Sequence, residues 1–164
     1  MAYAMTLNAA IKDNKEYLKE LIKKYEEELN DKNFDFIYTR LTDYSQVRSF
    51  TALLLKNNIN PLEYIDELPN YFAAELDIKK IIIPNGFINI PEGAFSDCSK
   101  LESIYIPKSV IDIGWAAFAG CNNLKDVYYE GTQEEWERIY IEESYLDEGD
   151  DNDALLNANI HYNI

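Results

Sequence analysis

The sequence has little of the side-chain chemistry that most enzymes use. Its 164 residues include a single histidine, His161, and only two cysteines, Cys98 and Cys121. One histidine leaves few routes to acid–base or nucleophilic catalysis near neutral pH, and two cysteines do not make the disulfide framework of a small secreted domain. Phosphate-binding glycine loops, Gly-x-Ser-x-Gly elbows, His-Glu-x-x-His helices and paired Cys-x-x-Cys motifs are absent as well. The sequence therefore predicts no enzymatic activity and no cofactor.

Basic residues and long apolar runs are also scarce. The chain has 15 Lys and Arg residues against 30 Asp and Glu residues, a net charge of −15, which repels nucleic-acid phosphates and anionic lipid. No apolar run approaches the roughly 18–20 residues that span a bilayer. The first residues, 1–7, have no basic residue before their apolar side chains, unlike a secretory signal. We therefore expect a cytoplasmic protein that contacts neither nucleic acid nor a membrane directly.

The negative charge is concentrated toward the C-terminal end. Residues 1–75 hold 9 basic and 13 acidic side chains, whereas residues 131–164 hold ten carboxylates and one basic residue, Arg138. We predict an exposed acidic loop before the last strand. Its acidic flank is formed by Asp147, Glu148, Asp150, Asp151 and Asp153. Clustered carboxylates suit calcium, but this loop lacks the Asp-x-Asp-x-Asp-Gly order and the closing glutamate, so we expect no metal site and leave calcium binding as an open alternative.

The first 75 residues have helical periodicity. Between residues 10 and 29 the apolar side chains recur at gaps of three, four and seven, which places them on one stripe of a single helix. These side chains are Ile11, Leu18, Leu21, Ile22, Tyr25 and Leu29. Shorter helices are expected over residues 34–42 and 45–56, and Asn60-Pro61 has the cap and first-turn residues that start another. We predict a small helical bundle without a ligand site of its own, joined to the rest by residues 71–74.

The second part of the chain repeats itself every 23 residues without a gap. Residues 78–100 align with residues 101–123, and a truncated third copy starts at Leu124. The matched pairs are Ile81 and Ile104, Pro84 and Pro107, Ile90 and Ile113, Phe95 and Phe118, and Cys98 and Cys121. A 23-residue unit with a three-residue strand cannot bury its own apolar face, so the units must stack.

Stacking places equivalent residues one above another at the strand spacing of about 4.8 Å. Two ladders then point inward, namely Ile81, Ile104 and Val127, and Ile83, Ile106 and Tyr129. Strand alternation turns two columns outward. The first column is Lys80, Ser103, Asp126 and Asn159, and the second is Ile82, Tyr105, Tyr128 and His161. Aromatic side chains on a rigid sheet are typical interface anchors, although tyrosine is also simply a good strand former. We predict that these eight residues bind a partner.

The two cysteines are expected to be stacked neighbours. Cα atoms about 4.4–6.8 Å apart can be bridged by a disulfide. Parallel side chains in a reducing cytosol favour two free, buried thiols with a structural role instead. Neither cysteine has a histidine in its own repeat unit, which argues against a Cys-His nucleophile.

This repeat resembles the BspA-type leucine-rich repeat, whose units read approximately L-x-x-I-x-I-P-x-S-V-x-x-I-G-x-x-A-F-x-G-C-x-x. Residues 101–123 match nearly every position, whereas residues 78–100 depart from it at Gly86-Phe87 and at Pro91. The stretch from Val127 to Asn163 resembles the closing unit of that family, and the helical leader resembles those of phage-encoded members. The resemblance implies an α+β chain, with a helical cap domain over residues 1–75 and a short parallel solenoid over residues 76–164. A helix over residues 133–141 and a strand near residues 160–162 would close the far end.

Three functions are open at this point. The leading hypothesis is a non-catalytic module that binds another protein through the solenoid sheet and the acidic flank, a role that the resemblance also implies. The alternative is a phage-encoded acidic inhibitor of a host nuclease or defence complex, because the net charge of −9 over residues 131–164 is similar to that of a phosphate track. The third is a structural or assembly component. No motif identifies the partner, and an oligomer is compatible with the sequence.

Overall fold

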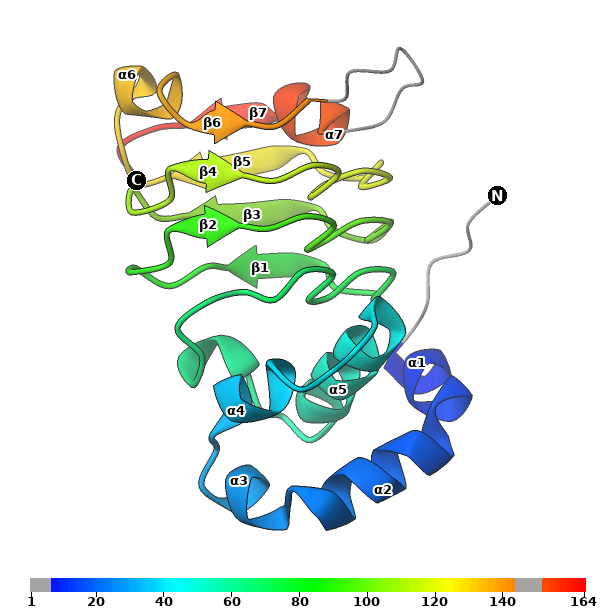
Figure 1. The fold of residues 1–164 in the computed structure, drawn as a ribbon. Helices are drawn as coiled ribbons and strands as arrows, with labels where there is room; N and C mark the ends of the chain where they lie inside the picture. The colour runs from blue at the N-terminus through cyan, green and yellow to red at the C-terminus, as the bar shows by residue number, and fades with distance from the viewer. Residues whose placement is uncertain (1–6, 144–151) are drawn as a thin grey trace.

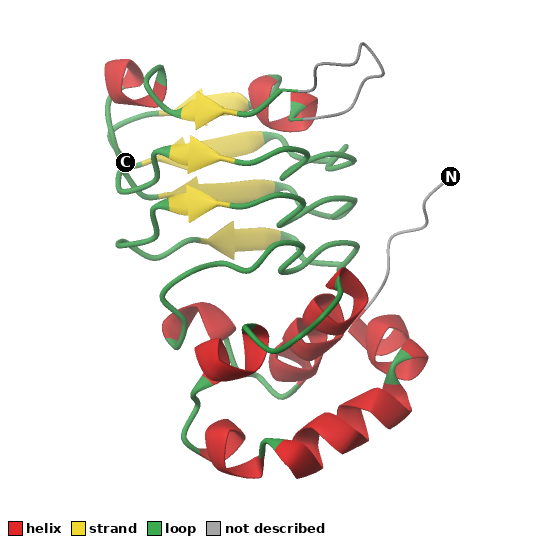
Figure 2. Ribbon diagram, in the orientation of Figure 1, coloured by secondary structure: helices red, strands yellow, loops and turns green. Residues whose placement is uncertain are grey.

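The molecule has helices at one end and a coil of short parallel strands at the other. The structure, a computed structural model, describes residues 7–143 and 152–164. Five helices come first: α1 (Leu7–Asp13), α2 (Lys15–Lys24), α3 (Glu26–Asn30), α4 (Phe34–Tyr38) and α5 (Tyr44–Lys56). They lie beyond the first strand, β1 (Lys80–Ile82), and the coils stack away from them (Figure 1, Figure 2). The predicted order of helices followed by parallel strands is confirmed. No helix within the described ranges has the length and apolar character needed to cross a membrane.

The single helix predicted over residues 10–29 is wrong, because the chain forms α1, α2 and α3 there. Asn14 and Tyr25 lie at the two breaks, both with φ of −117° and with ψ of 26° and 33°, outside the helical region. The first break lets α1 pack along α5, where the Asn14 amide donates a hydrogen bond of 2.7 Å to Ser49 Oγ. Of the predicted apolar stripe, Leu18 and Leu21 are buried, whereas Ile22 is 44% exposed.

The later helices begin at side-chain caps. The Asp43 carboxylate accepts a hydrogen bond of 3.0 Å from the backbone N–H of Gln46 at the start of α5. Asn60 likewise accepts a bond of 3.1 Å from the N–H of Leu62. The predicted start at Asn60-Pro61 is therefore confirmed, but only one 3-10 turn, η1 (Pro61–Glu63), follows it. The helix α4 is also shorter than the predicted segment 34–42.

Four parallel strands form the larger sheet, in the order β1-β3-β5-β7. The later three are β3 (Ser103–Ile106), β5 (Asp126–Tyr129) and β7 (Asn159–His161). Ile81 pairs with Ile104, Ile104 with Val127, and Val127 with Ile160, so the register follows the 23-residue repeat. Ile104 and Val127 are fully buried. The stacking expected from the repeat is confirmed, including the strand predicted near residues 160–162.

A second, three-stranded parallel sheet closes the other side of each coil. Its strands are β2 (Asn89–Ile90), β4 (Asp112–Ile113) and β6 (Tyr140–Ile141). Ile90 and Ile113 are buried as expected, but two-residue strands are too short to leave a periodic signal. The helix predicted over residues 133–141 is wrong beyond its first turn, α6 (Gln133–Trp136). The chain then joins the sheet, and the N–H of Tyr140 donates a bond of 3.0 Å to the Ile111 carbonyl.

Each coil turns its corner through a pair of residues in the left-handed backbone region. Three successive corners have such a pair, with φ between 54° and 71°: Tyr71 and Glu75, Gly93 and Asp97, Ala116 and Gly120. Consecutive corners are joined by backbone hydrogen bonds. The N–H of Ala73 donates to the Ala94 carbonyl (2.9 Å), as the N–H of Phe95 does to the Ala117 carbonyl (2.8 Å). Residues 71–74, expected only to join two parts, therefore already belong to the coil.

One hydrophobic core runs through the helices and the coils. The Phe72 ring lies 6.3 Å from the Phe95 ring, which lies 5.5 Å from the Phe118 ring. Arg48 of α5 also pairs with Glu75 of the first corner, with Nη1 and Oε2 3.2 Å apart. Packing is therefore continuous across residue 75, and the assignment of two domains that meet there stays a prediction.

Asn152 closes the last coil from inside. Its side chain is only 1% exposed, and its carbonyl oxygen accepts a bond of 3.1 Å from the Phe118 N–H. Its amide donates to the carbonyls of Gly114 (3.1 Å) and Glu142 (3.0 Å). In the preceding coil the equivalent N–H, that of Phe95, bonds to the backbone of the next coil. The Asn152 side chain thus takes the place of the backbone of a further coil.

Gly114→Ala should weaken the stack of coils. The added carbon would lie 2.6 Å from the backbone nitrogen of Glu92 and 2.9 Å from the carbonyl carbon of Pro91. We expect the free energy of unfolding, measured by urea denaturation, to fall by about 2 kcal/mol or more. Gly86→Ala is the control, because no heavy atom lies within 4 Å of its added carbon. Only the positive φ of Gly86 opposes this change, and we expect it to lower the free energy of unfolding by about 1 kcal/mol. If the two variants lost the same free energy of unfolding, the close approach of the coils at Gly114 would be contradicted.

Asn152→Ala should destabilise the last coil. The change leaves the buried N–H of Phe118 without a partner, at a cost of about 1–3 kcal/mol, and removes one of the two hydrogen bonds that the Gly114 carbonyl accepts. We expect the free energy of unfolding to fall by about 2–4 kcal/mol in the same denaturation assay. Asn157→Ala is the matched control at an exposed position after α7 (Asp153–Leu156), with an expected change within about 0.5 kcal/mol. A loss no larger than that of the control would show that Asn152 does not close the coil.

Candidate functional site

The two predicted outward columns lie side by side on the exposed face of the larger sheet. One column pairs Lys80, Ser103, Asp126 and Asn159 in register, and the other pairs Ile82, Tyr105, Tyr128 and His161. The inward neighbours on β3 and β5 are buried, whereas the outward residues are partly or fully exposed. The structure therefore brings all eight predicted residues onto one face. Their role in binding a partner stays a prediction.

The second column contains a continuous stack of rings, which we call the aromatic column: Tyr105, Tyr128 and His161. The centroids of Tyr105 and Tyr128 are 4.5 Å apart with an interplanar angle of 17°, and those of Tyr128 and His161 are 4.7 Å apart at 14°. These separations match the strand spacing of about 4.8 Å, so the parallel register of the sheet sets the stacking. Each ring covers the face of its neighbour, which leaves both tyrosines only partly exposed.

Charged groups from the first column hold the two ends of the aromatic column. Lys80 Nζ lies 4.8 Å from the centroid of the Tyr105 ring, a cation–π contact. At the other end, His161 Nε2 lies 2.8 Å from Asp126 Oδ1. Ile82, which is 55% exposed, extends the column beyond Tyr105. The rings are thus held in place before any partner binds, which reduces the entropy lost on binding.

The middle ring of the aromatic column, Tyr128, presents its edge and hydroxyl to solvent rather than an open ring face. Sugars and nucleobases that stack on proteins need an uncovered face, and Tyr128 has both of its faces covered. Within the described part of the chain, the hydroxyls of Tyr105 and Tyr128 have no hydrogen-bond partner. A row of free hydroxyls along a rigid apolar edge is suited to a protein surface that combines apolar side chains with hydrogen-bonding groups.

The acidic flank falls mostly outside the described residues. Asp147, Glu148, Asp150 and Asp151 lie there, as does most of the possible calcium loop. Asp153 is the exposed first residue of α7. Asn152, which we expected in an exposed loop, is buried because its amide completes the last coil. Over residues 7–143 and 152–164, no group of three His, Cys, Asp or Glu side chains is placed to hold a metal ion.

Cys98 and Cys121 form no disulfide and are buried in adjacent coils, as predicted. The Cys98 thiol donates to the Ala73 carbonyl (3.1 Å) and the Cys121 thiol donates to the Phe95 carbonyl (3.0 Å). Burial above all, and then the neighbouring Cys121, raise the pKa of the Cys98 thiol well above its usual value. Because the thiolate is the reactive form, Cys98 is a poor nucleophile.

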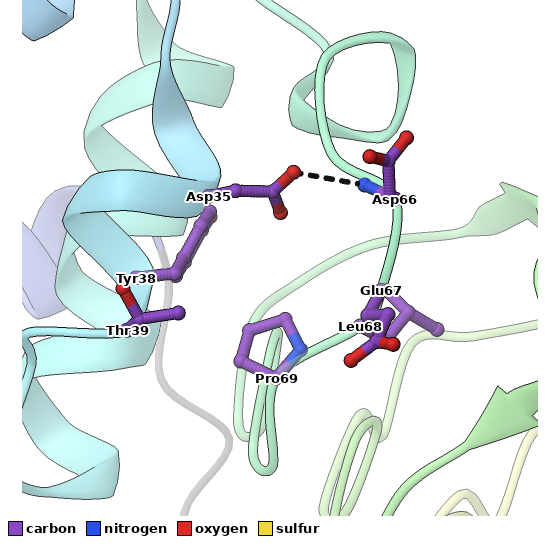
Figure 3. Close-up of a pocket in the computed structure, with 7 residues that line it drawn as sticks. All are labelled: Asp35, Tyr38, Thr39, Asp66, Glu67, Leu68 and Pro69. Atoms are coloured by element: carbon purple, nitrogen blue, oxygen red, sulfur yellow. Dashed lines mark hydrogen bonds between the residues drawn. The ribbon is translucent and has the colours of Figure 1, made fainter.

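No sequence pattern indicated the hollow beside α4 (Figure 3). It has a volume of about 380 Å³ and is lined by Asp35 and Tyr38 of α4, by Thr39 directly after that helix, and by residues 66–69. Its two walls are separated by about thirty residues of chain, so only folding brings them together. Asp35 and Asp66 carry no shared motif that would have paired them in advance.

The comparisons with known proteins concern the repeat. A family model described as the BspA type leucine rich repeat region (6 copies) matches residues 42–146. The crystal structure of a leucine-rich cell surface protein from Faecalibacterium prausnitzii A2-165 is 36% identical in sequence, with a TM-score of 0.44. That match covers 49% of this chain and 22% of the other chain, so it spans less than a quarter of the other protein. The comparison with curated proteins gave no match.

Both thiols should be unreactive in the folded protein. With 5,5′-dithiobis(2-nitrobenzoate) at pH 8, we expect reaction at least about a hundredfold slower than in guanidinium, because the thiols react only after opening of the coils. Two equivalents of thionitrobenzoate should be released after denaturation without a reductant. Rapid reaction of the native protein would contradict the burial of the thiols, and no release after denaturation would reveal a disulfide.

Proposed function

Since this chain belongs to the BspA-type leucine-rich repeat family, we propose that it is a non-catalytic module that binds another protein through the exposed face of its four-stranded sheet. Stacked repeats create extended surfaces of the kind that repeat proteins use for binding. The observation that carries the proposal is the aromatic column, in which Tyr105, Tyr128 and His161 stack on the solvent side of the sheet.

The aromatic column supports binding because it is both apolar and already ordered. Tyrosine is among the residues that contribute most energy at protein interfaces. Each tyrosine here is restrained by a neighbouring ring, so its rotamer freedom is already lost in the free protein. The side-chain entropy that these tyrosines lose on binding is therefore smaller than it would be for tyrosines on a flexible loop.

The first column supplies the polar part of the proposed interface. Lys80 and Asp126 bring opposite charges to the two ends of the aromatic column, and Ser103 and Asn159 add hydrogen-bonding groups beside them. Charged and polar groups around an apolar centre chiefly select the partner and fix its orientation. We therefore assign anchoring to the aromatic column and selectivity to Lys80 and Asp126.

A second candidate is favoured by the charge of the C-terminal end. Residues 131–164 have a net charge of −9, and exposed carboxylates of Glu134, Glu137, Glu143 and Asp153 belong to this region. An acidic inhibitor of a host nuclease or defence complex would occupy a basic channel through such a charge track, as a nucleic acid does. This candidate needs the carboxylates but not the aromatic column, so the two functions can be separated by mutation.

Replacing both tyrosines of the aromatic column should abolish most partner binding. A photo-crosslinking amino acid at the exposed position 125, directly before β5, first captures the partner in cells, and the affinity of the purified partner is then measured by calorimetry. For Tyr105→Ala with Tyr128→Ala we expect a loss of about 2 kcal/mol or more, roughly a thirtyfold rise in Kd. Melting curves verify that the double variant is folded.

The matched control is Tyr140→Ala with Ile111→Ala. Both side chains are exposed, at 59% and 61%, and they belong to the region of the second sheet. The control should keep the parental Kd within about twofold. If the control weakens binding as much as the tyrosine pair, the aromatic column is not the interface. If only Asp150→Asn, Asp151→Asn and Asp153→Asn together abolish binding, the charge-track function is supported instead.

A further inference from the structure

A second candidate surface lies at the junction of the helices and the first corner of the coil. The hollow beside α4 (Figure 3) adjoins another of about 510 Å³, which is lined by the start of α5 and by residues 69–71. The two hollows share Tyr38 and Pro69 in their linings, so they lie next to each other between α4–α5 and residues 66–71. We call the two adjoining hollows the seam groove.

The floor of the seam groove is apolar and firmly built. Tyr38 is buried, and its hydroxyl is hydrogen-bonded to Thr51 Oγ1 at 2.7 Å, so it offers the groove its ring rather than a polar group. Leu68 is buried beside it. At the α5 end, the half-exposed ring of Tyr44 lies 5.2 Å from the ring of Tyr71.

The rim of the seam groove is negatively charged. Asp35, Asp66 and Glu67 surround the first hollow, and Asp43 lines the second. Neither hollow is lined by a lysine or an arginine, and no ion pair among the described residues involves these four carboxylates. The Asp66 N–H donates to Asp35 Oδ2 (3.1 Å), as Figure 3 shows, so this bond ties α4 to the segment that carries Asp66, whereas the Asp66 carboxylate itself points away from Asp35.

The charges on this rim are unbalanced. Burial, and to a lesser extent the charges of Asp66 and Glu67, raise the pKa of the Asp35 carboxyl despite the hydrogen bond that it accepts. Arg48, whose guanidinium lies 5.2 Å from the Tyr44 ring, pairs with Glu75; its charge also acts on Asp43, but it forms no ion pair with Asp35, Asp66 or Glu67. A cation bound in the first hollow would relieve this repulsion.

We propose that the seam groove binds an extended basic segment of a partner protein, in which lysine or arginine alternates with apolar residues. Lysine and arginine combine an aliphatic stem, which fits the apolar floor, with a cation for the rim. The net charge of −15 attracts such a partner over a longer range. The seam groove lies apart from the aromatic column, on the helical side of the coil, and does not depend on it.

The test uses the full-length protein and a defined peptide. The probe is a fluorescein-labelled, amidated hexapeptide of alternating lysine and leucine, and its Kd is measured by fluorescence anisotropy at 0.15 M salt. A peptide of alternating glutamate and leucine is the negative probe and should not bind. Asp35→Asn, Asp66→Asn and Glu67→Gln together should weaken binding of the lysine peptide about tenfold or more, because three ion pairs are lost while the side-chain shapes are kept.

The charge-matched control separates a groove from general attraction to an acidic protein. Glu102→Gln, Glu137→Gln and Glu143→Gln remove the same three charges at exposed positions that line neither hollow. This control should change the Kd by no more than about twofold. Equal weakening by the two triple variants, or no binding of the lysine peptide to the parent protein, would overturn the proposal.

A groove-filling variant tests the position of the site without altering charge. Thr39 is exposed on the wall of the first hollow, so Thr39→Trp fills the space while leaving every carboxylate in place. We expect this variant to keep its melting temperature and to lose peptide binding about tenfold or more. Unchanged peptide binding to a folded Thr39→Trp protein would overturn the proposal.

Discussion

The stacking of 23-residue coils at the fixed spacing of parallel strands is the constraint on which the rest of this structure depends. No single coil has enough apolar surface to be stable alone, so each is held by the one above and the one below. The same register that places Ile104 over Ile81 inside the molecule places Tyr128 over Tyr105 outside it. The core and the exposed aromatic column are thus two consequences of one backbone pairing, and a slip of one residue would exchange them.

A short stack of this kind has to solve the problem of its two ends. At the first end the helices cover the coil, with the Phe72 ring continuing the phenylalanine ladder and the pair of Arg48 and Glu75 tying α5 to the first corner. At the last end one side chain, that of Asn152, satisfies backbone groups that another coil would have satisfied.

The proposed binding surfaces use the two parts of the chain in different ways. The aromatic column is repetitive, because its rings come from equivalent places in successive strands. The seam groove is not repetitive, because its walls come from α4, α5 and the segment that enters the coil. Its unbalanced carboxylates and apolar floor are suited to a basic ligand, whereas the ring edges and free hydroxyls of the aromatic column are suited to a mixed apolar and polar surface.

The amino-acid sequence by itself determined the solenoid, its inward ladders and its outward columns, because a repeat of constant length leaves one register in which like residues stack. It also determined that Cys98 and Cys121 would be buried neighbours. Only the tertiary structure decided the breaks at Asn14 and Tyr25, since packing of α1 on α5 overrides the local helical periodicity. The burial of Asn152, the strand at Tyr140 and the seam groove were likewise decided by contacts between distant segments, and such contacts leave no period in the sequence for a pattern to detect.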